Sequence, residues 1–136
     1  MTVKRVEVLA YAKINLMLDI IRRRTDGYHD LFMIMQSVGV ADRVTVEREP
    51  GRKLRLTASM DDIPLDDKNI AWKAAALFFN TTGLRLPGLH IHLEKHIPHA
   101  AGLAGGSADG AAVLVALNRL MGTDLSTDQL CAMGVQ

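Results

Sequence analysis

The sequence lacks most of the features that are typical of specialised classes of protein. A single cysteine, Cys131, excludes an internal disulfide and fits a reducing compartment. No apolar run reaches the ~20 residues that cross a bilayer, and the first residues lack the apolar centre of a signal peptide. A net charge of +1 provides no basic field for a nucleic-acid backbone. We therefore expect a cytoplasmic protein without a nucleic-acid or membrane partner.

The composition that remains is that of an ordinary folded domain. Hydrophobic residues make up 49% and charged residues 23% of the 136 positions, which argues against disorder. We find no internal repeat, low-complexity segment or long linker. The length suits one compact domain over residues 1–136.

Alternating apolar residues predict strands in the first half of the chain. Val6, Val8 and Ala10 alternate with more polar neighbours, and the Asp26–Gly27 pair marks a turn. Pro50–Gly51 breaks the pattern. The strands predicted on this basis cover residues 6–11, 14–21, 31–38, 43–49 and 54–59.

The second half changes to helical spacing. A helix is predicted over residues 70–80, with Asp67 or Asn69 as its cap and Gly83 as its stop. A half-buried strand follows at residues 89–94. Further helices are predicted over residues 107–121 and from a cap at Ser126. This order of elements favours an α+β fold with a mixed or mainly antiparallel sheet backed by helices.

A glycine-rich segment lies between the last predicted strand and the helix that follows it. Glycines let a backbone approach a ligand closely, and a helix N-terminus attracts anions. The spacing matches neither G-x-x-x-x-G-K-[ST] nor G-x-G-x-x-G. The alternative is a tight turn that only brings the helix onto the sheet. The candidate phosphate-binding residues are Pro98, His99, Ala100, Ala101, Gly102, Leu103, Ala104, Gly105, Gly106, Ser107 and Ala108.

Three other polar positions attract attention. Lys13 and Asn15 are two residues apart and share one face of a strand, so this lysine lies either at a solvated edge or in a site where its amine stabilises transferred charge. Tyr28 and His29 follow the turn and form either a stacking surface for a base or an ordinary hairpin end. The hydroxyl of Ser107 either caps its helix or binds a magnesium ion.

Histidines alternate along the strand predicted at residues 89–94. His90 and His92 share one face, which allows either a zinc site or a solvent-facing side of the strand. No cysteine stands near them at ligand spacing. We favour the solvent-facing interpretation.

Taken together, these motifs resemble a known family. Residues 98–108 resemble the second motif of the GHMP kinases, which transfer the γ-phosphate of ATP to small-molecule hydroxyl groups. Residues 12–16 and 26–29 resemble the branch of that family whose substrate is a cytidine diphosphate-linked methylerythritol of non-mevalonate isoprenoid synthesis. The resemblance covers residues 10–134. It implies a GHMP kinase N-terminal domain, similar to the second domain of ribosomal protein S5, with Mg²⁺ and ATP as cofactors.

The resemblance also implies a role for each matching residue. Lys13 would be the catalytic lysine beside the substrate hydroxyl, and Asn15 would line the same pocket. Tyr28 would stack on the cytosine and His29 would contact its edge. Residues 98–108 would surround the ATP phosphates, with Ser107 near Mg²⁺. The adenosine would lie near two more residues, Asn69 and Lys95.

The chain departs from the family pattern in length. Chains of the family are about twice as long, and their catalytic aspartate follows the segment that ends here at Gly134. The resemblance therefore implies a chain truncated before that aspartate and the C-terminal domain, with little kinase activity by itself. Two alternatives stay open. One is a homoserine or mevalonate type of GHMP kinase, which needs no base-binding loop, and the other is an S5-like RNA-binding or assembly module.

Overall fold

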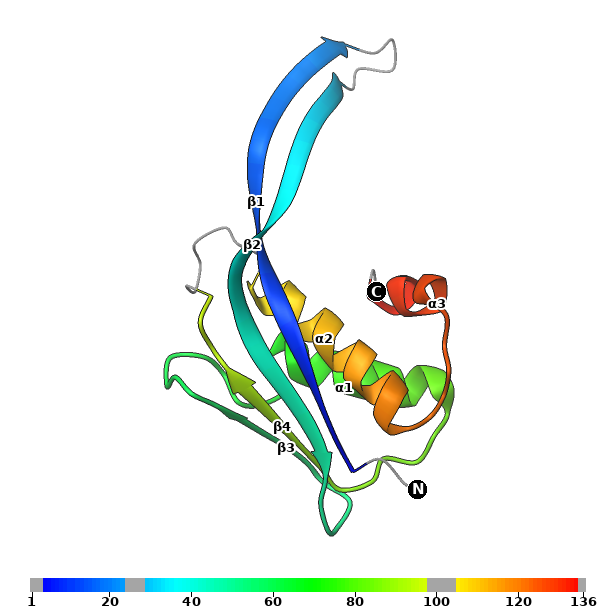
Figure 1. The fold of residues 1–136 in the computed structure, drawn as a ribbon. Coiled ribbons are helices and arrows are strands. Elements are labelled where there is room, and N and C mark those ends of the chain that lie inside the picture. Colours follow the sequence, from blue (N-terminus) through cyan, green and yellow to red (C-terminus); the bar gives the residue numbers. More distant parts are fainter. Residues whose placement is uncertain (1–3, 24–28, 98–104, 135–136) are drawn as a thin grey trace.

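A computed structural model describes the backbone of residues 4–23, 29–97 and 105–134, and the side chains of residues 4–11, 40–97 and 106–133. The elements occur in the order β1 (Arg5–Arg23), β2 (His29–Arg48), β3 (Leu54–Ala58), α1 (Ile70–Thr82), β4 (Leu89–Glu94), α2 (Gly105–Leu120) and α3 (Thr127–Gly134) (Figure 1). The sheet has the order β1-β2-β4-β3. Since β3 and β4 are parallel and the other pairs antiparallel, the sheet is mixed, which confirms the predicted α+β class.

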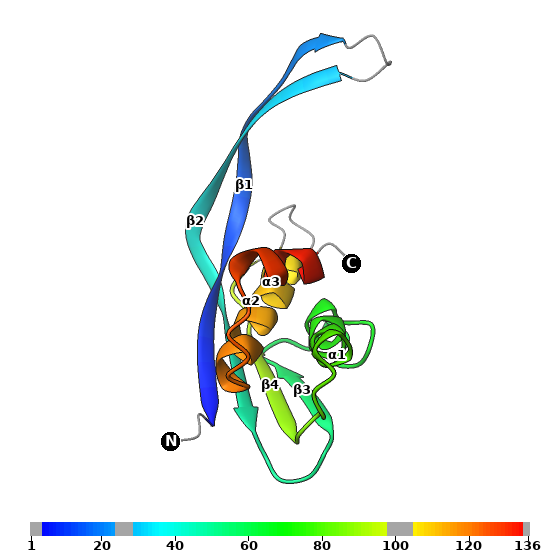
Figure 2. The same ribbon diagram turned by 90° about the vertical axis from the view of Figure 1, so that its right-hand side faces the viewer.

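The first two strands form one long hairpin that projects from the body of the molecule (Figures 1 and 2). The sequence predicted four shorter strands here, which is wrong. The β1–β2 register shifts between Tyr11 and Lys13, so an irregularity bends the strand without ending it. Strand β2 pairs with β4 only over Arg43–Arg48. The part of the hairpin farther from the body is therefore two-stranded.

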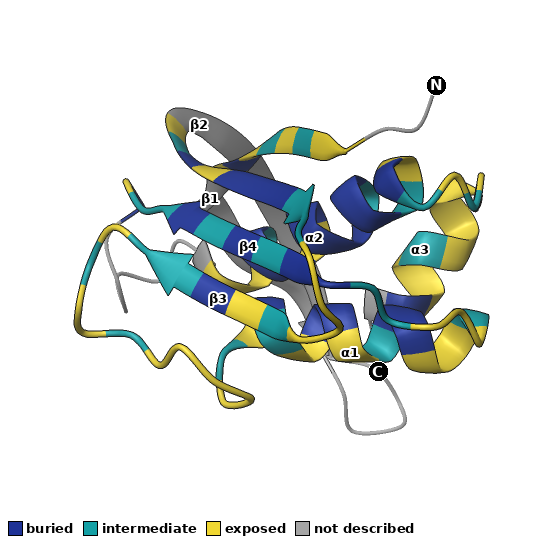
Figure 3. Ribbon diagram, turned by 90° about the horizontal axis from the view of Figure 1, so that it is seen from below, coloured by how far each residue is buried: buried dark blue, intermediate teal, exposed yellow. Residues whose placement is uncertain are grey.

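All three helices lie on one face of the sheet (Figure 2). Val44 and Val46 of β2 and Leu89, Ile91 and Leu93 of β4 face them, each no more than 1% exposed. The intervening residues of β4 are only half-buried, as the alternating bands of Figure 3 show. Burying an aliphatic side chain of this size stabilises the fold by about 1.5–3 kcal/mol, so this covered face is the main source of stability.

Local sequence signals determine where the helices begin and end. The side chain of Asn69 accepts a hydrogen bond from the amide of Ala71 at the start of α1, and Gly83 ends that helix with φ of 72°. Ser126 and Gln129 form a reciprocal capping box before α3. These predictions are confirmed. Helix α2 begins at Gly105, two residues before the predicted start.

Among the described residues, none of the helices combines the length and the apolar character that a membrane span requires.

Candidate active site

The N-terminal end of α2 has the properties of an anion site. This helix of 16 residues carries no acidic side chain in its first turn, and both Gly106 and Ser107 are exposed. Its partial positive charge therefore faces solvent without a competing carboxylate from that turn. A phosphate group fits this end of the helix, and the hydroxyl of Ser107 is accessible to a metal ion bound with it.

The start of α1 lies directly beside the start of α2. A Cβ atom added at Gly110 would lie 2.7 Å from Cγ2 of Ile70, and one added at Gly106 would lie 3.4 Å from Cδ1 of the same residue. Gly110 thus allows the two helices to approach closely. The structure thereby brings Asn69, the residue before Ile70, to the same end of the helix pair as Ser107.

The amide group of Asn69 is already engaged in structure. Its Oδ1 accepts from the amide of Ala71 at 2.8 Å, and its Nδ2 donates to the carbonyl of Pro64 at 2.8 Å. Both contacts hold the start of α1 in place. A direct contact between Asn69 and adenosine remains a prediction.

An apolar groove continues from this end between the helices. Its volume is about 440 Å³, within the range of small-molecule sites. Helices α1, α2 and α3 all contribute to its walls. The lining residues are Ile70, Lys73, Ala74, Leu77, Ser107, Gly110, Ala111, Leu114 and Met133.

A buried cluster of three charged residues, the buried triad of Asp42, Lys95 and Asp109, lies beneath the start of α2. The Nζ of Lys95 donates to Oδ2 of Asp42 at 2.6 Å and to Oδ2 of Asp109 at 2.7 Å. The side chains of Lys95, Asp42 and Asp109 are 6%, 0% and 3% exposed, respectively. The other oxygen of Asp42 accepts from the amides of His96 and Ile97 at 2.6 and 2.9 Å.

The two carboxyl groups of the buried triad differ in acidity. Burial and the neighbouring carboxylate of Asp42 raise the pKa of Asp109 to about 7, against the lowering effect of Lys95. Burial also acts to raise the pKa of Asp42, but the neighbouring carboxyl of Asp109, the amides of Ile97 and His96 and the amine of Lys95 together outweigh burial and lower it. For Lys95, burial lowers the pKa, and its two carboxylate partners more than offset that and raise it. Asp109 is thus the member of the buried triad whose pKa lies near neutral pH.

The candidate residues of the hairpin are positioned by strand register. Lys13 lies opposite Ser37 and Asn15 opposite Met35, whereas His29 pairs with Arg23 at the far end. Only the backbone is described at these positions. Tyr28 and residues 98–104 lie outside the described residues, so the predicted contacts of these residues stay predictions.

Asp42 and Asp109 were not predicted to belong to the site, although the sequence carries a signal for each. Asp42 has the same parity as the buried Val44 and Val46, and Lys95 the same parity as Leu89, Ile91 and Leu93. Asp109 shares a helical face with the buried Val113. A carboxylate on an apolar face requires a buried cation as partner. Lys95 is the cation that the structure provides.

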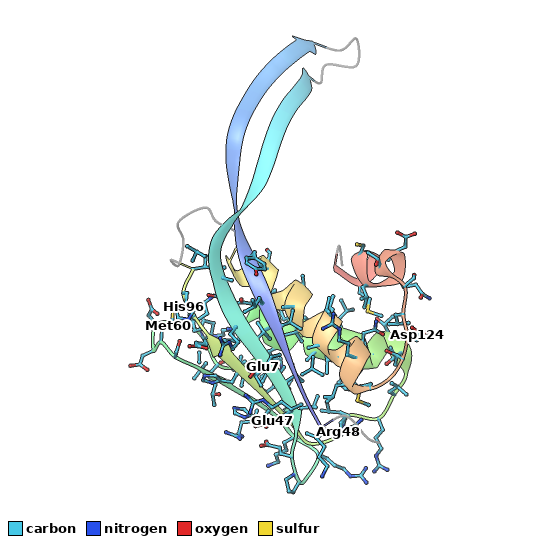
Figure 4. All side chains as sticks on the ribbon, viewed as in Figure 1. Glu7, Glu47, Arg48, Met60, His96 and Asp124 are labelled. Carbon is cyan, nitrogen blue, oxygen red and sulfur yellow. The ribbon has the colours of Figure 1, made fainter. Side chains whose placement is uncertain are left out.

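The opposite face of the sheet carries a second polar group, the open-face cluster of Glu47, Thr57, His90 and His92. The hydroxyl of Thr57 lies 2.7 Å from Nε2 of His90 and 2.7 Å from Nδ1 of His92. Nδ1 of His90 lies 3.3 Å from Oε1 of Glu47. Figure 4 shows Glu47 near the end of β2 that is remote from the hairpin tip, whereas His96, just after β4, lies closer to the projecting part of the hairpin. Within the described part of the chain, no group of three or more His, Cys, Asp or Glu residues is arranged to bind a metal ion.

Known proteins of similar sequence are kinases. The chain is 48% identical over 129 residues to the 4-diphosphocytidyl-2-C-methyl-D-erythritol kinase of Clostridium acetobutylicum, which is 95% of this chain and 45% of that protein. It is 46% identical over 125 residues to the kinase of the same name from Caldicellulosiruptor saccharolyticus, covering 92% and 43% of the two chains. The chain thus spans about half the length of the curated relatives it matches.

Two solved kinase structures are also similar to this chain. A crystal structure of 4-(cytidine 5'-diphospho)-2C-methyl-D-erythritol kinase matches 95% of this chain and 46% of its own, with a TM-score of 0.75 and 38% identity. A homoserine kinase from Cytophaga hutchinsonii matches 98% of this chain and 41% of its own, with a TM-score of 0.72 and 22% identity, and so shares the fold. Residues 69–136, half of the chain, match the family described as GHMP kinases N terminal domain. The chain belongs to the GHMP kinase family.

Proposed function

We propose that the protein catalyses the ATP-dependent phosphorylation of the 2-hydroxyl group of 4-diphosphocytidyl-2-C-methyl-D-erythritol, a step of non-mevalonate isoprenoid synthesis. The observation that carries this proposal is the 48% identity, over 95% of this chain, to a kinase of that name. GHMP kinases are ATP-dependent, which supports ATP as the phosphoryl donor. We place the reaction in the cytoplasm with Mg²⁺ as the metal ion.

The nucleotide site in this proposal comprises residues 98–108. The first turn of α2, in which Gly106 and Ser107 are exposed, offers backbone amides and a partial positive charge to the phosphates. Ser107 provides a hydroxyl ligand for the Mg²⁺ ion, since its side chain is exposed. When bound, ATP supplies the γ-phosphoryl group that the substrate hydroxyl receives. Asn69 contributes to the adenosine side of the site, whereas the amine of Lys95, also assigned there by the resemblance, is held by Asp42 and Asp109.

The alcohol site in this proposal lies on the hairpin. Lys13 acts on the substrate hydroxyl and on the negative charge that develops during transfer. Asn15 lines the same pocket, which is supported by its position two residues along the same strand. Tyr28 stacks on the cytosine and His29 contacts the edge of the base.

Residues 1–136 form the N-terminal, ATP-binding domain in this proposal. A catalytic aspartate and a C-terminal domain from elsewhere in the full-length protein complete the active site. The support is the coverage, since the chain corresponds to 45% of its kinase relative. We accordingly expect residues 1–136 alone to bind substrates weakly and to turn over little.

A substrate comparison tests the proposed function. Full-length protein with ATP and Mg²⁺ is expected to phosphorylate 4-diphosphocytidyl-2-C-methyl-D-erythritol, and phosphorus NMR is expected to place the new phosphate on the 2-hydroxyl. Homoserine and mevalonate serve as competing alcohols. Preferential phosphorylation of either one would contradict the proposal.

Two substitutions separate chemistry from nucleotide binding. Lys13→Met is expected to lower kcat by about a thousandfold or more while the Kd for ATP changes little, because the amine acts on the transition state. Gly105→Val is expected to abolish ATP binding, because a branched Cβ occupies space beside the phosphates. Normal turnover of Lys13→Met would remove this residue from the catalytic site.

A further inference from the structure

The buried triad joins the two ends of the glycine-rich segment. Lys95 lies directly after β4, upstream of residues 98–104, and Asp109 lies in the second turn of α2, downstream of them. The 2.7 Å contact between these two side chains therefore links both flanking segments without passing through the segment itself. Asp42 adds β2 to the connection through its 2.6 Å contact with Lys95.

Asp42 also constrains the backbone of the upstream flank. Its Oδ1 accepts hydrogen bonds from two consecutive amides, those of His96 and Ile97. One carboxylate thus holds both the side chain of Lys95 and the direction in which the chain leaves β4. Ile97, the last described residue before the segment, is 1% exposed, so this flank is buried as well as hydrogen-bonded.

A charged cluster is an unusual way to join three elements. Well-packed apolar side chains of similar volume are often equally stabilising or better, because buried charges lose their hydration. Charged hydrogen bonds do, however, impose distances and directions that apolar contacts do not. The cluster is thus suited to setting a geometry at a place where a ligand with fixed dimensions binds.

We propose that Asp42, Lys95 and Asp109 are positioning residues that fix the separation of Ile97 and the start of α2 for binding of a nucleotide triphosphate. This inference rests on the proposed function. Lys95 acts here through the two carboxylates and not through the adenosine, because its amine is enclosed by them at 2.6 and 2.7 Å. The geometry they set serves the phosphate chain, whichever base is attached to it.

Two ligands distinguish positioning from direct contact. ATP and inorganic tripolyphosphate share the phosphate chain, but only ATP has an adenosine. In full-length Lys95→Met we expect the Kd of both ligands to rise by the same factor, about tenfold or more, because misplaced donors weaken all phosphate contacts. Asp109→Asn is expected to weaken both ligands equally as well, by a smaller factor, since asparagine keeps one acceptor for Lys95.

Arg55→Met is the matched control. Arg55 also forms a short ion pair, with Oε2 of Glu49 at 2.8 Å, but it is 53% exposed and belongs to β3 on the open face. Its removal is expected to leave both Kd values unchanged. Amide hydrogen exchange gives an independent readout: exchange at His96 and Ile97 is expected to accelerate in Lys95→Met, while that of the β4 core stays as in the wild type.

Each outcome has a defined meaning. A loss confined to ATP would overturn the proposal and assign Lys95 to the adenosine, and unchanged affinity for both ligands would overturn it while leaving the proposed function intact. A wild-type protein that binds neither ligand would overturn the proposed function and this role together. If Lys95→Met does not fold, Lys95→Arg serves the same comparison, because it keeps the cation and displaces its donors.

Discussion

The two faces of the sheet each carry a polar group, and both groups include a residue of β2 and a residue in β4 or directly after it. The buried triad lies under the helices, with its three side chains no more than 6% exposed. The open-face cluster lies on the uncovered side, where Glu47 is 38% exposed. Asp42 and Glu47 come from one strand and are an odd number of residues apart. Because successive side chains of a strand face opposite sides of the sheet, these two lie in opposite environments.

This difference decides what each polar contact contributes. On the covered face, an unpaired carboxylate or ammonium would lack water as a substitute partner, so every member of the buried triad depends on the other two. On the open face, water replaces a lost partner at small cost. Similar distances therefore correspond to different energies, and the following substitutions test that contrast.

The largest effect is expected for Asp42→Ala compared with Glu47→Ala. Removing Asp42 leaves the amides of His96 and Ile97 without their acceptor and Lys95 with one carboxylate, which should lower the free energy of unfolding by about 3–5 kcal/mol. Removing Glu47 should cost less than about 1 kcal/mol. Urea-induced unfolding of the full-length protein measures both. Equal losses for the two variants would show that burial does not govern the contrast.

The second effect concerns pH and Asp109. Its pKa is about 7 in the folded protein, above its ordinary value of 3.8, so the folded state binds the proton more tightly than the unfolded state. The contribution of Asp109 to stability is therefore greatest at low pH and falls as pH rises from about 4 to about 7. The asparagine side chain of Asp109→Asn is neutral at every pH, so the stability of this variant does not fall in this way as pH rises.

Urea unfolding of the wild type and Asp109→Asn between pH 4.5 and 8 checks this prediction. Relative to the variant, the wild type should lose stability on the order of 3 kcal/mol across the window and no more above it. Other carboxylates titrate in both proteins and cancel in the comparison. Parallel pH profiles would mean that Asp109 is ionised throughout the range.

The smallest effect is expected on the open face for Thr57→Val. Valine keeps the shape and the strand preference of threonine but removes the hydroxyl between His90 and His92. Both rings lie on the uncovered face, where water can replace the lost hydroxyl, so the free energy of unfolding should fall by about 1 kcal/mol or less. Nitrogen chemical shifts of the two imidazole rings should change clearly, since each loses a partner. A loss as large as that of Asp42→Ala would place the open-face cluster among the main stabilising contacts.

The elements of the fold that depend on local signals were predictable from the sequence. Asn69, Gly83 and Ser126 act within one turn of their own position, and the cap or stop predicted for each is found in the structure. The long hairpin was not predictable in one piece, because polar residues between the apolar runs looked like strand ends. Pairing of β1 with β2 supplies the hydrogen bonds that keep those residues extended.

The buried triad needed information that no short window contains. Parity directs Asp42 and Lys95 toward the covered face, but their contact depends on the pairing of Arg43 with Glu94, whose positions are 51 residues apart in the chain. Asp109 joins them only because α2 packs over this end of the sheet. Long-range pairing of this kind follows from the whole core and not from local preference. The glycine-rich segment was recognisable by composition, whereas the residues that connect its flanks were not.

Asp42 also lies where β2 leaves the four-stranded sheet, one residue from its last pairing with β4. From Asp42 the strand runs 13 residues farther from the sheet to His29, a length of about 40 Å at ~3.3 Å per residue. A rotation of about 5° at its root would carry the far end by about 3 Å, the length of a hydrogen bond. Lys13, which pairs with Ser37 five residues from Asp42, would shift by less than half as much. A substitution at the root of the hairpin would thus displace its far end more than twice as much as the position of Lys13.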